Sequence, residues 1–148
     1  MPGTPDPHLP ETIVAFDFGL RRIGVAVGQD VTASANPLAA VRNGHAGPDW
    51  RAIGNIIDEW RPSRLIVGIP KHDDGSESGL AGHIRAFVRE LARFELPVGT
   101  VDERYSSLEA GELLKSERAA GLRGKLRKEA VDSVAAALIA GRWLRRDR

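Results

Sequence analysis

The acidic residues Asp17, Glu103 and Asp132 are the residues of this sequence best suited to chemistry. Each stands at or beside the end of an apolar segment, where an ionised carboxylate is costly unless hydrogen bonds, a cation or a metal compensate it. Carboxylate oxygens suit Mg²⁺ or Mn²⁺. Two such ions roughly 4 Å apart can activate a water and stabilise a leaving oxygen, as phosphodiester hydrolysis requires. The three residues therefore predict a site for two divalent ions, with Asp17 as the bridging ligand and Glu103 and Asp132 on either side.

Asp17 follows the apolar segment Ile13–Phe16, and a second apolar segment, Ile23–Val27, comes after a turn that contains glycine and arginine. Two such segments around a short turn predict a β-hairpin with Asp17 near its tip. Asp and Gly are also ordinary turn residues. This stretch alone leaves two interpretations open for Asp17, a turn former or the first ligand of a metal or phosphate site.

The other two acidic positions carry alternatives of their own. Asp102 and Glu103 follow the apolar segment Pro97–Val101, and alternate strand residues point to opposite faces, so spacing alone does not say which one faces the metals. We predict Glu103, with Asp102 as second choice. Asp132 lies within or beside the apolar stripe of the last helix. Two other interpretations of Asp132 stay open: an exposed acid that the helix dipole favours, or an ion-pair partner of Lys128.

Basic residues near these acids are candidates for holding phosphate oxygens. Residues 118–148 carry nine Lys and Arg against three Asp and Glu, whereas the rest of the chain carries twelve against seventeen. This asymmetry suggests a polyanionic partner, although a solvated helix face with a charged tail explains it equally well. The predicted nucleic-acid contacts are Arg21, Arg22, Lys71, Arg104, Arg123, Lys125, Arg127 and Lys128.

Length and composition indicate one globular domain. The chain has 148 residues, of which 42% are hydrophobic, enough for one core and short for two. Four prolines in the first ten residues predict a disordered leader over 1–12, followed by a single domain over 13–148. Cysteine is absent, which excludes disulfides and thiolate zinc sites and means that any homodimer is non-covalent. No segment resembles a signal peptide or a membrane span, so we expect a cytoplasmic protein without membrane association.

The remaining periodicities predict alternating helices and strands. Further strands are expected over 36–42, 65–69 and 97–101. Helices are expected over 49–60 and 80–91, from Ser106 to about Ser116 with a capping box, and over 128–144. Polar loops are expected over 71–76 and 117–127. The first three strands should pair antiparallel, and the last two should run parallel to the first. The predicted fold is therefore of the α/β class, a five-stranded mixed sheet flanked by helices, and it brings Asp17 and Asp102–Glu103 to one edge of the sheet.

A few further residues are predicted to be structural. Trp50, Trp60 and Trp143 occur at helical spacings and are expected to belong to the core rather than to stack on bases. His83 should lie at the surface or the boundary of its helix. His72, Asp73 and Asp74 lie in a loop that could overhang the site, but a solvated turn is the simpler interpretation.

Four motifs, taken in order, resemble the YqgF/RuvX family of bacterial RNase H-like nucleases. They are Asp-Phe-Gly with Arg-Ile-Gly-Val-Ala, Leu-Ile-Val-Gly-Ile-Pro with Asp74-Gly75, Val-Asp-Glu-Arg-Tyr-Ser-Ser, and Lys-Glu-Ala-Val-Asp-Ser-Val-Ala-Ala-Ala-Leu-Ile. The resemblance runs from about Ile13 to Leu144. It implies an RNase H-like fold and a two-metal nuclease site of Asp17, Glu103 and Asp132. The hydroxyl residue after Asp-Glu-Arg is often threonine in the family, whereas this chain has Ser106-Ser107.

The resemblance implies cleavage of structured RNA, in maturation of the 5′ end of pre-16S rRNA, or resolution of branched DNA by a Holliday-junction resolvase. Resolution normally requires a two-fold dimer, and the sequence leaves monomer and weak dimer open. A non-catalytic RNA-binding module is a further alternative. A nucleotide-binding ATPase of the actin/hexokinase superfamily opens with a similar Asp-x-Gly strand, but such enzymes close two domains around the nucleotide, and this chain has the length of one.

Overall fold

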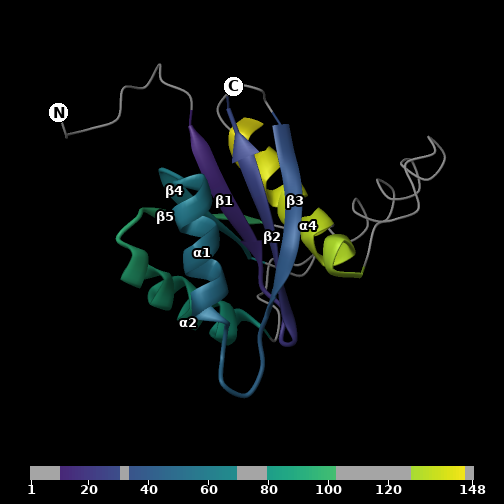
Figure 1. Ribbon diagram of the computed structural model, residues 1–148, viewed down its shortest axis with the longest axis vertical. Helices are drawn as coiled ribbons and strands as arrows, with labels where there is room; N and C mark the ends of the chain where they lie inside the picture. Colours follow the sequence, from purple (N-terminus) through teal and green to yellow (C-terminus); the bar gives the residue numbers. More distant parts are fainter. Residues whose placement is uncertain (1–10, 31–33, 70–79, 103–127, 146–148) are drawn as a thin grey trace.

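A computed structural model describes residues 11–30, 34–69, 80–102 and 128–145, with the side chains of the last segment described from Ser133 onward (Figure 1). The strands are β1 (Thr12–Asp17), β2 (Arg22–Gln29), β3 (Ser34–Arg42), β4 (Arg64–Ile69) and β5 (Val98–Asp102), and the helices are α1 (Trp50–Trp60), α2 (Ala81–Glu90) with the 3₁₀ turn η1 (Leu91–Phe94), and α4 (Lys128–Arg145). The predicted helix from Ser106 and the predicted loops over 71–76 and 117–127 lie outside the described residues.

The sheet has the predicted mixed topology. Its strand order is β3-β2-β1-β4-β5, with antiparallel pairing of β1 with β2 and of β2 with β3, and parallel pairing of β1 with β4 and of β4 with β5. The central strands β1 and β4 have four consecutive buried residues each, because helices cover both faces of the sheet. The prediction of three antiparallel strands and two later parallel ones is confirmed.

β3 forms one edge of the sheet and begins at Ser34, two residues before the predicted start. Pro37 is tolerated there because an edge strand has one side without a neighbour to which it must donate. The register between β2 and β3 shifts between Ile23 and Val25, so β3 contains one extra residue at this point. Such a bulge twists the strands locally and is common beside functional sites.

The two faces of the sheet are covered differently. α1 and α2 cover one face with a cluster of large buried side chains that includes Phe16, Ile53 and Phe87. α4 covers the other face and buries mainly alanines against β1 and β2, together with Ile139 and Leu144. Figure 1 shows α1 and α4 on opposite sides of the strands.

The tryptophans and His83 behave as predicted where the structure describes them. Trp50 and Trp60 pack against the cluster under α1 and α2, and Trp143 packs against the cluster under α4. His83 is exposed on α2. None of the described helices combines the length and apolar composition needed to cross a bilayer.

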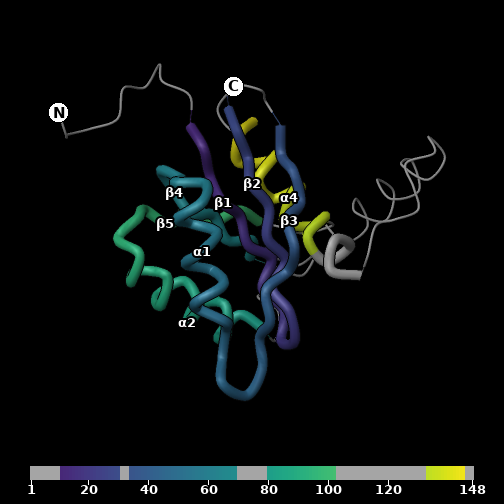
Figure 2. The backbone as a smooth tube through the Cα atoms, viewed as in Figure 1, coloured from purple at the N-terminus to yellow at the C-terminus, as the bar shows by residue number. Residues whose placement is uncertain are grey.

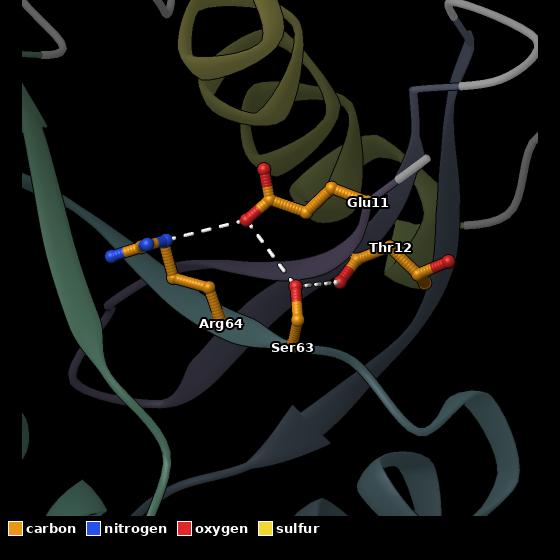
Figure 3. A network of polar contacts seen from close by, with 4 residues as sticks. All are labelled: Glu11, Thr12, Ser63 and Arg64. Carbon is orange, nitrogen blue, oxygen red and sulfur yellow. Dashed lines mark hydrogen bonds and ion pairs between the residues drawn. The ribbon is translucent and has the colours of Figure 1, made fainter. Parts of the chain in front are cut away.

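The start of β1 corrects the boundary of the predicted leader. Glu11 and Thr12 are part of the folded domain rather than of a disordered segment, because β1 begins at Thr12 and the Glu11 carboxylate accepts hydrogen bonds from Arg64 Nε and from the Ser63 hydroxyl, both at 3.3 Å (Figure 3). The Ser63 hydroxyl also lies 3.4 Å from the Thr12 carbonyl. These contacts join the beginnings of β1 and β4, at the end of the sheet opposite Asp17.

Candidate functional site

Asp17 is half-buried at the last position of β1 and lines an open pocket of about 410 Å³. Residues alternate between the two faces along β1. Ile13 and Ala15 belong to the cluster under α4, whereas Val14 and Phe16 belong to the cluster under α1 and α2. Asp17 therefore occupies a position on the α4 side. The other residues that line the pocket are Gly19, Leu20, Arg21, Arg22 and Gly24.

Two glycines shape this pocket. Gly24 lies directly opposite Asp17 in the β1–β2 pair and has no side chain to fill the space beside the carboxylate. Gly19 lies in the turn, where an added Cβ would stand 2.5 Å from the carbonyl oxygen of Arg22. A side chain at position 19 would therefore force the hairpin to open, which explains why the turn between β1 and β2 contains glycine.

Asn43 braces the same turn from the end of β3. Its side-chain amide donates to the Gly19 carbonyl at 2.7 Å, and its backbone N–H donates to the Arg21 carbonyl at 2.9 Å. Both bonds tie the hairpin that carries Asp17 to the β3–α1 connection, and Figure 2 shows the two loops at the same end of the molecule. Sequence analysis missed Asn43, for which a polar residue directly after a strand was the only available signal.

Asp102 ends β5 at the same end of the sheet, but it does not share a face with Asp17. Val98 packs on the α1 and α2 side and Val101 on the α4 side, so alternation places Asp102 on the side of α1 and α2. β4 also separates β1 from β5, so two strand spacings, about 10 Å, lie between them. The Asp102 carbonyl accepts a hydrogen bond from Arg142 Nη1 at 2.8 Å, which ties β5 to α4.

Asp132 lies in α4 directly before Ser133, and the structure shows how this part of the helix is held. Ser133 is fully buried, and its hydroxyl accepts a hydrogen bond from the Val25 N–H at 3.0 Å. Val25 is the residue at which the β2–β3 register shifts. The hydroxyl thus anchors the start of α4 beside Gly24, the cross-strand neighbour of Asp17. Ser133 was not predicted as an anchor, although a serine within the alanine stripe that faces the sheet could have indicated it.

The packing of α4 shows which of its ends lies near Asp17. Leu144 and Ala140 approach Gly28, whereas Ala136 and Ala137 pack with Ala26. The helix therefore runs in the same direction as β2, and its N-terminal end lies at the end of the sheet where β1 finishes. Glu103 and the side chain of Asp132 are outside the described residues, and no three acidic or histidine side chains come together within the described part.

Some of the predicted basic residues lie in the described part of the chain, and others lie outside it. Arg21 and Arg22 line the Asp17 pocket. Lys128 is the first residue of α4. Lys71, Arg104, Arg123, Lys125 and Arg127 lie outside the described residues, as do His72, Asp73 and Asp74. The pocket thus combines a carboxylate with two guanidinium groups, a set that can hold a metal ion beside a phosphate.

A family model decides where this chain belongs. The RuvX family, described as Holliday junction resolvase, matches residues 11–146. The chain belongs to the RuvX family. A relative from Nitrosococcus oceani, named "Putative pre-16S rRNA nuclease", is 44% identical over 141 residues, which cover 95% of this chain and 90% of the relative. A relative from Chromobacterium violaceum with the same name is 45% identical over 131 residues, which cover 88% and 94%.

Solved structures confirm the RNase H-like fold of this RuvX family member. The chain is similar to the Thermus thermophilus RuvC in complex with a Holliday junction substrate, with a TM-score of 0.52 and 19% identity over 87% of this chain and 91% of RuvC. It is also similar to the fowlpox virus Holliday junction resolvase, with a TM-score of 0.51 and 12% identity over 90% and 97%. At these identities the likeness concerns the fold.

Proposed function

We propose that this RuvX family member is a metal-dependent nuclease that hydrolyses phosphodiester bonds in the 5′-end processing of pre-16S rRNA, in the cytoplasm. The observation that carries the proposal is the half-buried Asp17 carboxylate in a pocket that it shares with Arg21 and Arg22. The names of relatives at 44–45% identity over nearly the whole of both chains support the substrate. Family membership favours this activity over the ATPase alternative.

The proposed ligands of the divalent ions are Asp17, Glu103 and Asp132. The fit is chemical, because carboxylate oxygens are what Mg²⁺ and Mn²⁺ prefer. We choose Glu103 over Asp102 because Asp102 occupies the face of the sheet away from Asp17. The start of α4 near Gly24 supports Asp132 as the third ligand.

The roles of the chain's residues follow from these positions. The ions, when bound, lower the pKa of a coordinated water and stabilise the leaving oxygen. Asp17 follows four consecutive buried residues of β1, so its carboxylate is carried by a well-packed backbone that is already in place for the reaction. Arg21 and Arg22 orient the phosphate by charge-assisted hydrogen bonds.

Cleavage of a labelled pre-16S 5′-leader RNA, with Mg²⁺ or Mn²⁺ and with EDTA, tests the proposal. We expect metal-dependent cutting by the wild type, and at least a 100-fold loss in Asp17→Asn, because that change removes a ligand charge without changing shape. Asp58→Asn, which alters an exposed acid on α1, is the matched control and should cut normally. Metal-independent cutting, or full activity in Asp17→Asn, would contradict the proposed site.

The description of the family model supports a second candidate, resolution of branched DNA. A synthetic four-way DNA junction in the same assay separates the two substrates. Symmetric resolution also requires a two-fold dimer, so sedimentation of the protein on the junction should show two copies if this candidate is right. RNA binding without cleavage, unchanged in Asp17→Asn, would instead identify a non-catalytic binding module.

A further inference from the structure

Three arginines surround a second pocket beside the Asp17 site. Its volume is about 480 Å³, and it is lined by Arg21, Arg22, Ala40, Arg42 and Asn43. Arg22 and Arg42 are direct cross-strand partners at the start of β2 and the end of β3. Arg21 is the neighbour of Arg22 in the chain and is exposed, as is Arg42.

The placement of Arg42 opposite Arg22 is unfavourable for the isolated fold. Like charges directly opposite each other on neighbouring antiparallel strands destabilise the pair. Two other arginines in the described part, Arg64 and Arg93, have carboxylate partners, at 3.3 Å in Glu11 and 3.4 Å in Glu90. Arg22 has an interaction of its own, whereas within the same part the side chains of Arg21 and Arg42 form no ion pair or hydrogen bond. An external anion would relieve this concentration of positive charge.

The backbone that carries these arginines is held in place. Asn43 donates to the carbonyls of Gly19 and Arg21, so the ends of β2 and β3 and the turn before them form one braced unit. The bulge in β3 lies in the same region, between the pairs of Ile23 and Val25. A fixed backbone lowers the entropy lost when the arginines bind a ligand.

This second pocket continues the Asp17 pocket, because Arg21 and Arg22 line both. A chain of phosphates that has one member at Asp17 would therefore meet Arg22 and then Arg42 as it passes toward the edge strand. A nucleic-acid strand provides such a chain of anions, and guanidinium groups bind phosphate oxygens in a bidentate manner.

We propose that Arg42, together with Arg21 and Arg22, forms a phosphate-binding groove that holds the substrate strand next to the cleavage site, on the β3 side. The inference rests on the proposed nuclease function and adds the path of the strand, with Arg42 as a contact outside the acidic site. The groove recognises the sugar–phosphate backbone and therefore contributes affinity without reading the bases.

The test is equilibrium binding of a fluorescein-labelled 5′-leader RNA in EDTA, where no metal-dependent cleavage occurs, at salt concentrations from about 50 to 200 mM. Arg42→Gln should weaken binding roughly tenfold, since a charge-assisted phosphate contact is lost. It should also reduce the slope of log K against log salt by about one. The thermal midpoint should stay the same or rise, because the like-charge pair is gone.

Arg61→Gln is the matched control. Arg61 is an exposed arginine at the end of α1, near the beginning of β4, where the Ser63 N–H donates to Thr12 at the opposite end of the sheet from Asp17. Its substitution should leave affinity and salt slope unchanged. If both variants lost RNA affinity equally, the loss would be due to the lower net charge of the protein, and the proposed groove would be wrong.

The outcomes separate this inference from the proposed function. If the wild type cuts RNA in a metal-dependent way but Arg42→Gln binds with wild-type affinity and slope, the groove is wrong and the nuclease stands. If the wild type neither binds nor cuts the RNA, the proposed function fails, and the groove fails with it. A lower thermal midpoint in Arg42→Gln, with unchanged binding per folded molecule, would make Arg42 a structural residue and overturn the proposal.

Discussion

The two faces of the sheet are packed with side chains of different size. On the α1 and α2 side, aromatic rings interlock: Phe87 meets Phe16 edge-on at 5.5 Å and stacks on Trp50 at 5.6 Å between ring centroids. On the α4 side, alanines and glycines let the helix approach the strands closely, so that a Cβ on Gly28 would lie 3.1–3.3 Å from side-chain atoms of Ile13, Leu144 and Ala140.

This difference suggests that one face mainly stabilises the fold, whereas the other mainly positions α4. The large side chains on the α1 and α2 side contribute most of the buried apolar area and therefore most of the stability. Small side chains contribute less area, but they determine where the α4 backbone lies over β1 and β2. Since α4 also carries Asp132, substitutions under α4 should affect cleavage more than their effect on stability predicts. Three substitutions test this comparison.

The largest effect on stability is expected for Phe87→Ala. Phe87 is buried and contacts three aromatic rings, including that of Phe18 at 5.4 Å. The free energy of unfolding in urea should fall by about 3–5 kcal/mol. Cleavage per folded molecule should fall far less than stability, because α4 and the Asp17 side chain lie on the other face and Phe87 reaches Asp17 only through its chain neighbours Phe16 and Phe18. A loss of cleavage in fully folded protein would show that the two faces are coupled.

Ser133→Ala should have the next largest effect on stability and a larger effect on activity. Removal of the hydroxyl leaves the buried Val25 N–H without its acceptor, which costs about 1–3 kcal/mol. If this bond positions Asp132, the Mn²⁺ concentration needed for half-maximal cleavage should also rise. Ser63→Ala, a serine exposed at the far end of the sheet, is the control. Reduced stability with an unchanged Mn²⁺ requirement would make Ser133 only a structural residue.

Gly28→Ala should have the smallest effect on stability, a loss of about 1 kcal/mol, because the added methyl group crowds Ala140 and Leu144. The helix must move slightly away from the sheet, so cleavage should fall as well. The control is Gly82→Ala in α2, where a Cβ meets nothing within 4 Å and the substitution should stabilise the helix by up to about 1 kcal/mol. Wild-type cleavage in Gly28→Ala would contradict the positioning role of this face.

Several features of the fold followed from local patterns. The apolar segments that end in Asp17 and Ile69 predicted strands because a strand buried on both faces needs continuous hydrophobic residues, and both strands have four consecutive buried residues. The segment before Asp102 also formed the predicted strand, although none of its residues is fully buried. The helix over Trp50–Trp60 followed from its apolar stripe. Asp49, which the prediction placed inside the helix, caps it instead, because its carboxylate accepts from the Ala52 N–H at 3.1 Å. Asn43 and Ser133 were not predicted, because each acts through a partner 24 or 108 residues away.

Sequence by itself determined that Asp17 ends a buried strand, that glycines shape the turn beside it, and that one sheet with helices on both faces accommodates the chain. These properties depend on residue types at short spacings. Only the tertiary structure decided that Asp102 occupies the opposite face from Asp17, that Arg22 faces Arg42, and that Ser133 anchors α4 to Val25. Strand register and helix placement arise from packing between distant segments, and a shift of one residue would reverse every one of these assignments.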